Sequence, residues 1–259
     1  MMIKINKLID LKGKNVLITG ASGYLGQKIA ETLNDFGVNL YLTDISNESL
    51  SVFNKKKFLR SKRFVCDLSK ENERKKLIKK IKKLDILINN AAYVGTSKLK
   101  GWDTKFVNQN LESWRQAMEV NLTAPFNLIR DFSTLLKQNA NSSIINISSI
   151  YGHKAPEYNI YKNTKMNNIA GYAISKAGLN QLTKWSASTL GPKVRVNTIS
   201  IGGIFRNQNK AFVKRYKEKT FLKRMAKEED IIGGVIFFAS NMSSYITGQN
   251  LFIDGGFSV

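Results

Sequence analysis

Cysteine and long apolar runs are both scarce in this chain of 259 residues, and each scarcity excludes a class of protein. The single cysteine, Cys66, excludes a disulfide within the chain and fits a reducing compartment, with the ordinary role of a small buried apolar residue. The longest apolar stretch without a charge, residues 231–239, falls far short of the ~18 residues that a membrane-spanning helix needs. The N-terminal residues carry lysines but no apolar run long enough for a signal peptide. We therefore expect a cytoplasmic protein without a membrane partner.

Acidic residues and histidine are also few. The chain has 19 Asp and Glu against 41 Lys and Arg, a formal net charge of +22, which raises the question of a nucleic-acid partner. It lacks zinc-finger spacing, an RNA-binding aromatic motif and a basic low-complexity tail. The lysines form short runs within 55–57 and 79–83, where Ile78 and Ile81 supply the apolar side of a helical pattern. We expect solvated helix faces there, with a lesser role in attracting anionic substrates, and neither nucleic acid nor a metal. The lone His153 fits a surface loop better than a catalyst.

Short β-branched runs alternate with helical patterns along the whole chain, and 42% of the residues are hydrophobic, enough for a full core. Near-continuous apolar strands separated by helices are typical of a parallel sheet that is covered on both faces. No repeat, linker or change of composition divides the chain, so we predict one α/β domain over residues 1–259, a doubly wound (Rossmann-type) sheet of seven parallel strands. The predicted strands are residues 15–19, 38–43, 63–65, 85–88, 143–147, 194–199 and 250–253. Ligands bind such sheets at the carboxyl ends of the strands.

A glycine-rich turn, TGASGYLG at residues 19–26, follows the first predicted strand and opens a helix. Gly20, Gly23 and Gly26 allow a tight turn, close approach of the backbone to a pyrophosphate, and close packing of the helix on the strand. The helix N-terminus then offers amide groups and the positive end of its dipole to the phosphates. A plain turn is the alternative, but the strand–turn–helix context with an acidic residue ~25 residues later favours a dinucleotide site.

Acidic and small residues follow the next three predicted strands. Asp44 can accept hydrogen bonds from the adenosine ribose and would repel a 2′-phosphate, and no Arg or Lys lies within residues 21–25 or directly after Asp44. The sequence therefore favours NAD over NADP, with capping of the next helix as the alternative role of Asp44. Asp67 either accepts from the adenine amino group or caps the helix that begins near Ser69. In NNAA, residues 89–92, small side chains let a cofactor lie close to the backbone and the asparagines can pin the strand ends.

Further polar residues lie where chemistry is expected. Asn121 interrupts an otherwise apolar helical stretch, residues 111–138, which we expect to break near residues 121–125. Asparagine is unfavourable inside a helix, so a packing or functional reason is needed. The fifth strand ends in the serine pair Ser148 and Ser149, at the edge of the sheet.

A tyrosine four residues before a lysine places both side chains on one face of a helix. A lysine ammonium beside a phenol favours the phenolate, so a tyrosine of ordinary pKa ~10 can act as a base nearer neutral pH. The segment after Tyr161 is polar and rich in asparagine, whereas the segment after Tyr172 is amphipathic, which favours Tyr172 as the helical copy. The spacing occurs three times, at Tyr158/Lys162, Tyr161/Lys165 and Tyr172/Lys176.

These motifs, together with the closing pattern FxASxxSxYITGQxLxxDGG, resemble the single-domain soluble branch of the short-chain dehydrogenase/reductase family over roughly residues 12–257. The resemblance implies that Ser149 polarises the substrate oxygen and that the tyrosine is the acid and base. It also implies that the lysine binds ribose and lowers the pKa of the tyrosine, and that Asn121 orders a water relay. The cofactor residues indicated by the motifs and the resemblance are Gly20, Ser22, Gly23, Tyr24, Leu25, Gly26, Asp44, Asp67, Leu68, Asn90, Ala91, Ala92, Tyr172, Lys176, Gly203 and Ile204.

The family pattern and this chain differ at several places. The family's tyrosine follows its serine by about a dozen residues, which fits Tyr161, whereas Tyr172 requires about ten inserted residues. We assign Tyr172 and Lys176, because the run from Tyr172 to the next strand has the length that the family shows. Tyr24 stands where the branch usually has glycine, and Arg206 stands where a threonine often holds the nicotinamide carboxamide.

The inserted residues 153–171 join Ser149 to Tyr172 and should overhang the site. The pattern IYxxTxM before YAxxK, followed by GGIFxNQ, is similar to family members of bacterial surface-glycan and flagellin-modification pathways, which implies a sugar, sugar phosphate or nucleotide sugar as substrate. We therefore predict an NAD(H)-dependent oxidoreductase that interconverts a secondary alcohol and a ketone on an anionic small molecule, in a homo-oligomer, tetramer or dimer. The alternatives are a 3-oxoacyl or other small-ketone reductase and, in another class, a non-catalytic dinucleotide-binding regulator.

Overall fold

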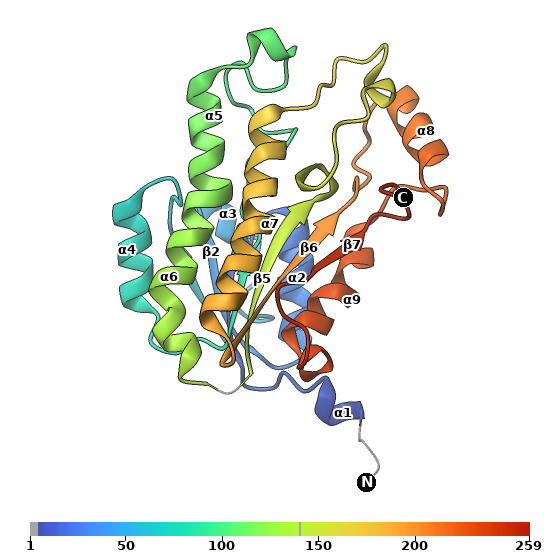
Figure 1. The fold of residues 1–259 in the computed structure, drawn as a ribbon. Helices are drawn as coiled ribbons and strands as arrows, with labels where there is room; N and C mark the ends of the chain where they lie inside the picture. Colours follow the sequence, from blue (N-terminus) through green and yellow to red (C-terminus); the bar gives the residue numbers. More distant parts are fainter. Residues whose placement is uncertain (1–4, 140) are drawn as a thin grey trace.

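The computed structural model describes residues 5–139 and 141–259, and its centre is one sheet of seven strands with helices on both faces (Figure 1). The strand order is β3-β2-β1-β4-β5-β6-β7, and neighbouring strands run parallel. The order reverses between β1 and β4, which is the point where doubly wound sheets bind ligands. The predicted fold class is confirmed. The strands are β1 (Asn15–Thr19), β2 (Asn39–Asp44), β3 (Ser61–Val65), β4 (Ile86–Asn89), β5 (Ser142–Ser149), β6 (Val194–Ile201) and β7 (Asn250–Ile253).

Two apolar layers hold the helices on the sheet. One layer packs α2, α3 and α9 against one face, with Ile29 and Phe238 fully or almost fully buried. The other packs α4, α6 and α7 against the opposite face around Leu77, Phe132 and Ala187. The helices are α1 (Ile5–Leu8), α2 (Tyr24–Asp35), α3 (Asn47–Leu50), α4 (Glu71–Lys80), α5 (Leu111–Met118), α6 (Ala124–Lys137), α7 (Ala170–Leu190), α8 (Lys210–Lys219) and α9 (Glu228–Ala239).

The inner strands are buried along their length. Every residue of β4 and β5 is buried, as expected for strands covered on both faces, whereas β3 at the edge of the sheet alternates between exposed and half-buried residues. The paired strands β5 and β6 both extend two residues beyond their predicted ends, to Ser149 and Ile201. This extension carries the serine pair to the edge of the sheet where the ligand is expected.

The predicted break in the helical stretch 111–138 takes another form. The chain stays helical throughout, but Glu119–Thr123 form a π-helical turn between α5 and α6. Such a turn adds a residue to the helix and often marks a functional site. Pro125 lies just after this turn, and its missing N–H interrupts the regular helical hydrogen bonds there.

The lysine runs lie on solvated faces, as expected. The side chains of residues 55–57 and of the four lysines within 79–83 are exposed. Over the described part of the chain, the helices are too short or too polar to cross a bilayer.

Candidate active site

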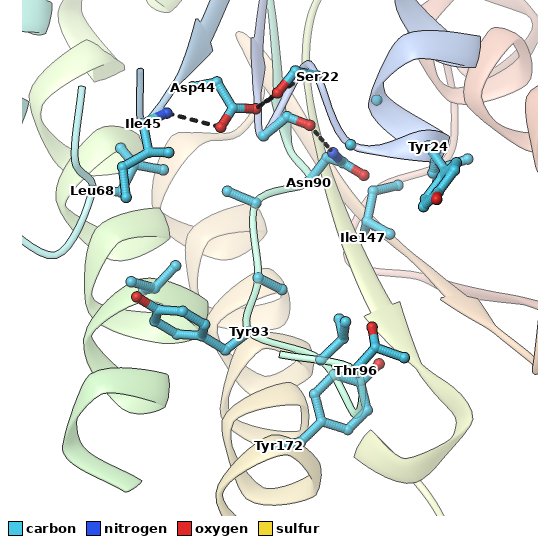
Figure 2. A pocket seen from close by; sticks show the side chains of 18 of the residues that line it. Ser22, Tyr24, Asp44, Ile45, Leu68, Asn90, Tyr93, Thr96, Ile147 and Tyr172 are labelled. Atoms are coloured by element: carbon cyan, nitrogen blue, oxygen red, sulfur yellow. Dashed lines mark hydrogen bonds between the residues drawn. The ribbon is translucent and has the colours of Figure 1, made fainter. Parts of the chain in front are cut away.

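The carboxyl ends of the strands on both sides of the β1–β4 reversal enclose a cavity of about 680 Å³. Figure 2 shows Ser22, Asp44 and Asn90 at one end of it and Tyr172 with Thr96 at the other. This volume is typical of a small-molecule site. The expected cofactor residues that line it are Gly20, Ser22, Gly23, Tyr24, Leu25, Gly26, Asp44, Asp67, Leu68, Asn90, Ala91, Ala92, Tyr172, Lys176 and Ile204.

Gly203 is the exception among the expected cofactor residues. Its N–H donates to the hydroxyl of Tyr216, and an added Cβ would lie 2.9 Å from the Tyr216 ring and from Met225. Gly203 does not line the cavity, and its contact with the cofactor stays a prediction. Its small size serves packing against α8, and Ile204, the next residue, lines the cavity instead.

The glycine-rich turn has no room for side chains at two positions. Gly20 adopts φ +59°, and a Cβ there would lie 2.7 Å from the Cα of Ala91. A Cβ on Gly26 would lie 2.2 Å from the Gly20 carbonyl oxygen, so α2 packs directly on the turn. Gly23, the residue that caps α2, has no side chain to cover the N–H groups of the first helical turn. The turn therefore fits a diphosphate, for which these N–H groups and the helix dipole are suited.

Asp44 and Asn90 hold this turn in place. The carboxylate of Asp44 accepts from the N–H of Ser22 at 2.9 Å and from its hydroxyl at 2.5 Å (Figure 2). The side chain of Asn90 donates to the carbonyls of Thr19 and Gly20 at 3.0 and 2.9 Å. Asn90 thus fixes the end of β4 to the turn. Asp44 is bound to the turn through Ser22, and both residues line the cavity.

The structure shows the capping role of Asp67, and the contact with the adenine amino group stays a prediction. Its side chain accepts from the N–H and hydroxyl of Ser69 at 3.0 and 2.7 Å, so it caps the turn before α4. It also lines the cavity next to Leu68.

Asn121 lies on the π-helical turn and is fully buried. Its amide oxygen accepts from the N–H of Tyr93 at 2.8 Å, and its amide nitrogen donates to the Tyr93 carbonyl and the Ser175 hydroxyl, both at 3.0 Å. These bonds join the segment after β4 to α7, one residue before Lys176. The side chain therefore positions these two segments, and the water relay that the resemblance implies stays a prediction.

Tyr172 and Lys176 lie one helical turn apart on α7, and both line the cavity. The Lys176 Nζ donates to the Ile147 carbonyl at 2.7 Å and lies 6.0 Å from the centre of the Tyr172 ring. Burial lowers the pKa of Lys176 to about 7. Burial also raises the pKa of Tyr172, and a hydrogen bond with Ser149 opposes that rise without cancelling it.

The two serines at the end of β5 have different surroundings. Ser148 lines the cavity, and its hydroxyl donates to the Lys176 carbonyl at 3.2 Å. Ser149 does not line the cavity; it accepts from the N–H of Tyr151 at 3.2 Å and lies next to the Tyr172 phenol. The serine singled out by the resemblance thus adjoins the tyrosine, and its neighbour faces the cavity.

The competing tyrosines lie elsewhere. Tyr161 is on a short 3-10 turn, Tyr158–Tyr161, and its hydroxyl is 2.8 Å from that of Tyr151. Its partner in the motif, Lys165, is exposed, as are Tyr158 and Lys162. Neither of these two motif copies lines the cavity.

Comparison with known proteins decides the family. A family model described as enoyl-(acyl carrier protein) reductase matches residues 20–258. The chain belongs to the short-chain dehydrogenase/reductase family. Members are oxidoreductases that bind a nicotinamide dinucleotide, and the glycine turn and cavity described above fit that cofactor.

Three relatives show how close the likeness is. The post-translational flagellin modification protein A of Campylobacter coli is 29% identical over 96% of this chain and 100% of its own length. A 3-oxoacyl-[acyl-carrier-protein] reductase of Rickettsia conorii is 34% identical over 96% of this chain and 98% of its own. A solved short-chain dehydrogenase of Leptospira borgpetersenii serovar Hardjo-bovis, with bound NAD+, is 34% identical, covers 100% of this chain and 98% of its own, and has a TM-score of 0.86.

The structure adds cavity residues to this short-chain dehydrogenase/reductase that sequence reasoning missed. Tyr93, Val94 and Thr96 follow β4, and Arg206, which the sequence marked only as a departure from the family pattern, follows β6. Their position directly after two strands, at the edge of the sheet where ligands bind, is the signal that points to them.

The inserted segment 153–171 lies at the same end of the sheet (Figure 1) but does not line the cavity. Arg215 of α8 donates to the carbonyls of Ile160, at 3.3 Å, and Lys162. Gln109 bonds to the carbonyl of Asn168 and the N–H of Ala170, both at 3.0 Å. The segment therefore forms an outer wall near the site, fixed from two sides.

The buried Lys176 predicts a pH dependence of stability. Its pKa is about 7 in the folded chain against an ordinary value of 10.5, so between these values the unfolded chain binds more protons. The free energy of unfolding should therefore rise with pH in this window, by at most ~1.4 kcal/mol for each pH unit. Urea unfolding of the wild type and Lys176→Met from pH 6.5 to 10 measures the difference. If the free energy of unfolding changed with pH in the same way in both proteins, the prediction would be wrong.

Proposed function

We propose that this protein is an NAD(H)-dependent oxidoreductase that interconverts a secondary alcohol and a ketone. The observation that carries the proposal is the placement of Tyr172 and Lys176 on one face of α7, lining the same cavity as the glycine-rich turn. A proton-transferring group thus lies within one continuous space with the site that fits a dinucleotide. A non-catalytic dinucleotide-binding regulator would not need this pair.

In the proposed mechanism the Tyr172 phenolate takes the hydroxyl proton of the alcohol, and in the reverse direction the Tyr172 phenol gives its proton to the ketone oxygen. Ser149, beside the phenol, holds the substrate oxygen. Lys176, when protonated, favours the phenolate and binds the ribose next to it. The nicotinamide, when bound, accepts or supplies the hydride. Asn121 keeps the Tyr93 segment and α7 at a fixed separation, which defines the space for the reacting groups.

Asp44 supports NAD as the preferred cofactor, because its charge lies at the cavity end where the adenosine ribose is expected. Asp44→Asn retains an acceptor for Ser22 and removes the charge. We expect the ratio of the Kd for NADP to that for NAD to fall by about tenfold, which corresponds to ~1.4 kcal/mol. Titration of the protein with NAD and with NADP, monitored by fluorescence, gives the two Kd values and their ratio.

The matched control for this prediction is Ser22→Ala. It removes the hydroxyl that bonds to Asp44 but leaves the carboxylate, so the preference for NAD should persist. Tighter binding of NADP than of NAD by the wild type would overturn the assignment.

For the substrate we propose a sugar, sugar phosphate or nucleotide sugar of glycan biosynthesis. Three observations support this class. The chain is similar over its whole length to a flagellin modification protein. The net charge of +22 suits an anionic substrate. The insertion brings exposed polar side chains, among them Tyr158, Lys162 and Lys165, to the substrate end of the sheet.

The second candidate is reduction of a 3-oxoacyl thioester, favoured by the 34% identity with a 3-oxoacyl-[acyl-carrier-protein] reductase. One experiment separates the two. The enzyme is supplied with a panel of nucleotide sugars, sugar phosphates and a 3-oxoacyl thioester, each with NAD(H) and NADP(H), and the absorbance of the reduced nicotinamide is followed. A kcat/KM that is highest for the thioester would replace the sugar proposal, and turnover of no alcohol or ketone would favour the regulator.

We further propose a cytoplasmic homo-oligomer, dimer or tetramer. Large apolar side chains are exposed on α5 and α7: Leu111 is 68% exposed and Trp185 58%. Such a surface supports burial in an assembly. Analytical ultracentrifugation measures the oligomeric state.

A further inference from the structure

Arg206 and Tyr24 meet at the cofactor cavity. The guanidinium carbon of Arg206 lies 4.5 Å from the centre of the Tyr24 ring, and both side chains line the cavity. Tyr24 is the first residue of α2, and Arg206 follows β6. The pair therefore joins two segments that lie far apart in the sequence, at the helix end where the glycine-rich turn fits a diphosphate.

The guanidinium of Arg206 is only partly engaged by protein groups. Glu228, the first residue of α9, accepts from its Nε at 3.1 Å and its Nη2 at 2.7 Å through one carboxylate oxygen. One face of the group rests on Tyr24. Within residues 5–139 and 141–259, Nη1 has no acceptor. An arginine offers five N–H donors in a planar fork that matches phosphate oxygens, so this edge is available to a ligand in the cavity.

The charges around the cavity favour a cation beside the diphosphate. A dinucleotide diphosphate carries two negative charges, and the turn of residues 20–26 contains no Lys or Arg. Asp44 and Asp67 add negative charge to the walls. The cationic lining residues are Lys176, which is held by Ile147 beside Tyr172, and Arg206. Arg206 is the one that stands next to the first residue of α2.

We propose that Arg206 binds the diphosphate of the cofactor beside the glycine-rich turn. Tyr24 is the platform on which the guanidinium lies, and Glu228 fixes its orientation. The proposal rests on dinucleotide binding, which is part of the proposed function. Because NAD and NADP share the diphosphate, Arg206 strengthens the binding of both and leaves the choice between them to Asp44.

The test compares Arg206→Gln with a matched control, Arg224→Gln. Arg224 also pairs with a carboxylate at the start of α9, that of Asp230, at 2.5 and 2.7 Å, but it does not line the cavity. Each protein is titrated calorimetrically with ADP-ribose, which contains the diphosphate, and with adenosine, which lacks it. The comparison separates contacts to the diphosphate from contacts to the adenosine. We expect Arg206→Gln to raise the Kd for ADP-ribose by about tenfold, as loss of a charge-assisted bond predicts, and to leave that for adenosine unchanged. Arg224→Gln should change neither.

The platform has its own pair of variants. Tyr24→Phe keeps the ring and should bind ADP-ribose like the wild type, whereas Tyr24→Leu should weaken binding several-fold. Thermal melting of each variant shows whether it is folded. An unchanged Kd in Arg206→Gln, or an equal loss for adenosine and ADP-ribose, overturns the proposal for Arg206. A wild type that does not bind ADP-ribose overturns dinucleotide binding itself, and with it both proposals.

Discussion

Tyr172→Phe should lower kcat by ~10²–10⁴-fold while leaving the Kd for NAD nearly unchanged, because general acid–base catalysis typically contributes this much and only the hydroxyl is lost. The ring of Tyr172 keeps its place in the apolar cluster around Trp102 and Ile169, so the fold should be preserved. Steady-state rates with an accepted substrate, together with cofactor titration, measure the two quantities.

Tyr161→Phe is the matched control for the catalytic tyrosine. Its hydroxyl bonds to that of Tyr151 rather than to a group of the cavity, so the variant should lose about 1 kcal/mol of stability and little activity. If Tyr161→Phe removed activity and Tyr172→Phe did not, the assignment of the acid–base group would be wrong.

Gly26→Ala should raise the Kd for NAD by at least about tenfold, corresponding to ~1.4 kcal/mol. The new Cβ would lie 2.2 Å from the Gly20 carbonyl oxygen and 2.7 Å from that of Ala21, and both are backbone atoms that a side-chain rotation cannot move. α2 must then shift away from the turn, taking its N-terminal N–H groups with it. Overpacking of this kind also costs ~1–3 kcal/mol of stability. Cofactor titration and denaturant unfolding measure the two effects.

A second glycine provides the comparison. Gly233 lies inside α9, and a Cβ there meets nothing within 4 Å. Gly233→Ala should therefore keep the wild-type Kd and gain ~0.5–1 kcal/mol of stability, because alanine loses less conformational freedom in a helix. Equal behaviour of the two variants would show that the close packing of α2 on the turn has no role in binding.

The fold could be predicted almost completely from the sequence, because buried strands consist of short runs of apolar residues that can be recognised in it. β1 and β7 begin and end where the pattern predicts. The apolar run predicts β5 only to residue 147, although the serine pair is expected at its end; the two polar serines become part of the strand through pairing with β6. Tertiary pairing thus overrides the local pattern at the place where the site is built.

The candidate site could be predicted in its residues but less well in its geometry. The motif at Gly20, Gly23 and Gly26 predicts the turn, because positions where the backbone leaves no room for a Cβ must be glycine. The packing of Gly203 against Tyr216 could not be predicted, because a glycine that makes room for a tyrosine on α8 is indistinguishable in sequence from one that makes room for a cofactor. The approach of Arg206 to Tyr24 depends on the path of the chain after β6, which no local pattern determines.

The anchors of residues 153–171 have a consequence for how this enzyme can acquire new substrates. Arg215, Gln109 and Asp103 all hold the segment through its main-chain carbonyl and N–H groups. Main-chain atoms are the same for almost every residue type, so most exposed side chains of the segment can be exchanged without releasing it. Selection can therefore change the exposed surface of the segment while Tyr172, the proposed acid–base group immediately downstream, keeps its position. A library randomised at the exposed positions 158, 162 and 165 is the natural starting point for redesigning specificity in this scaffold.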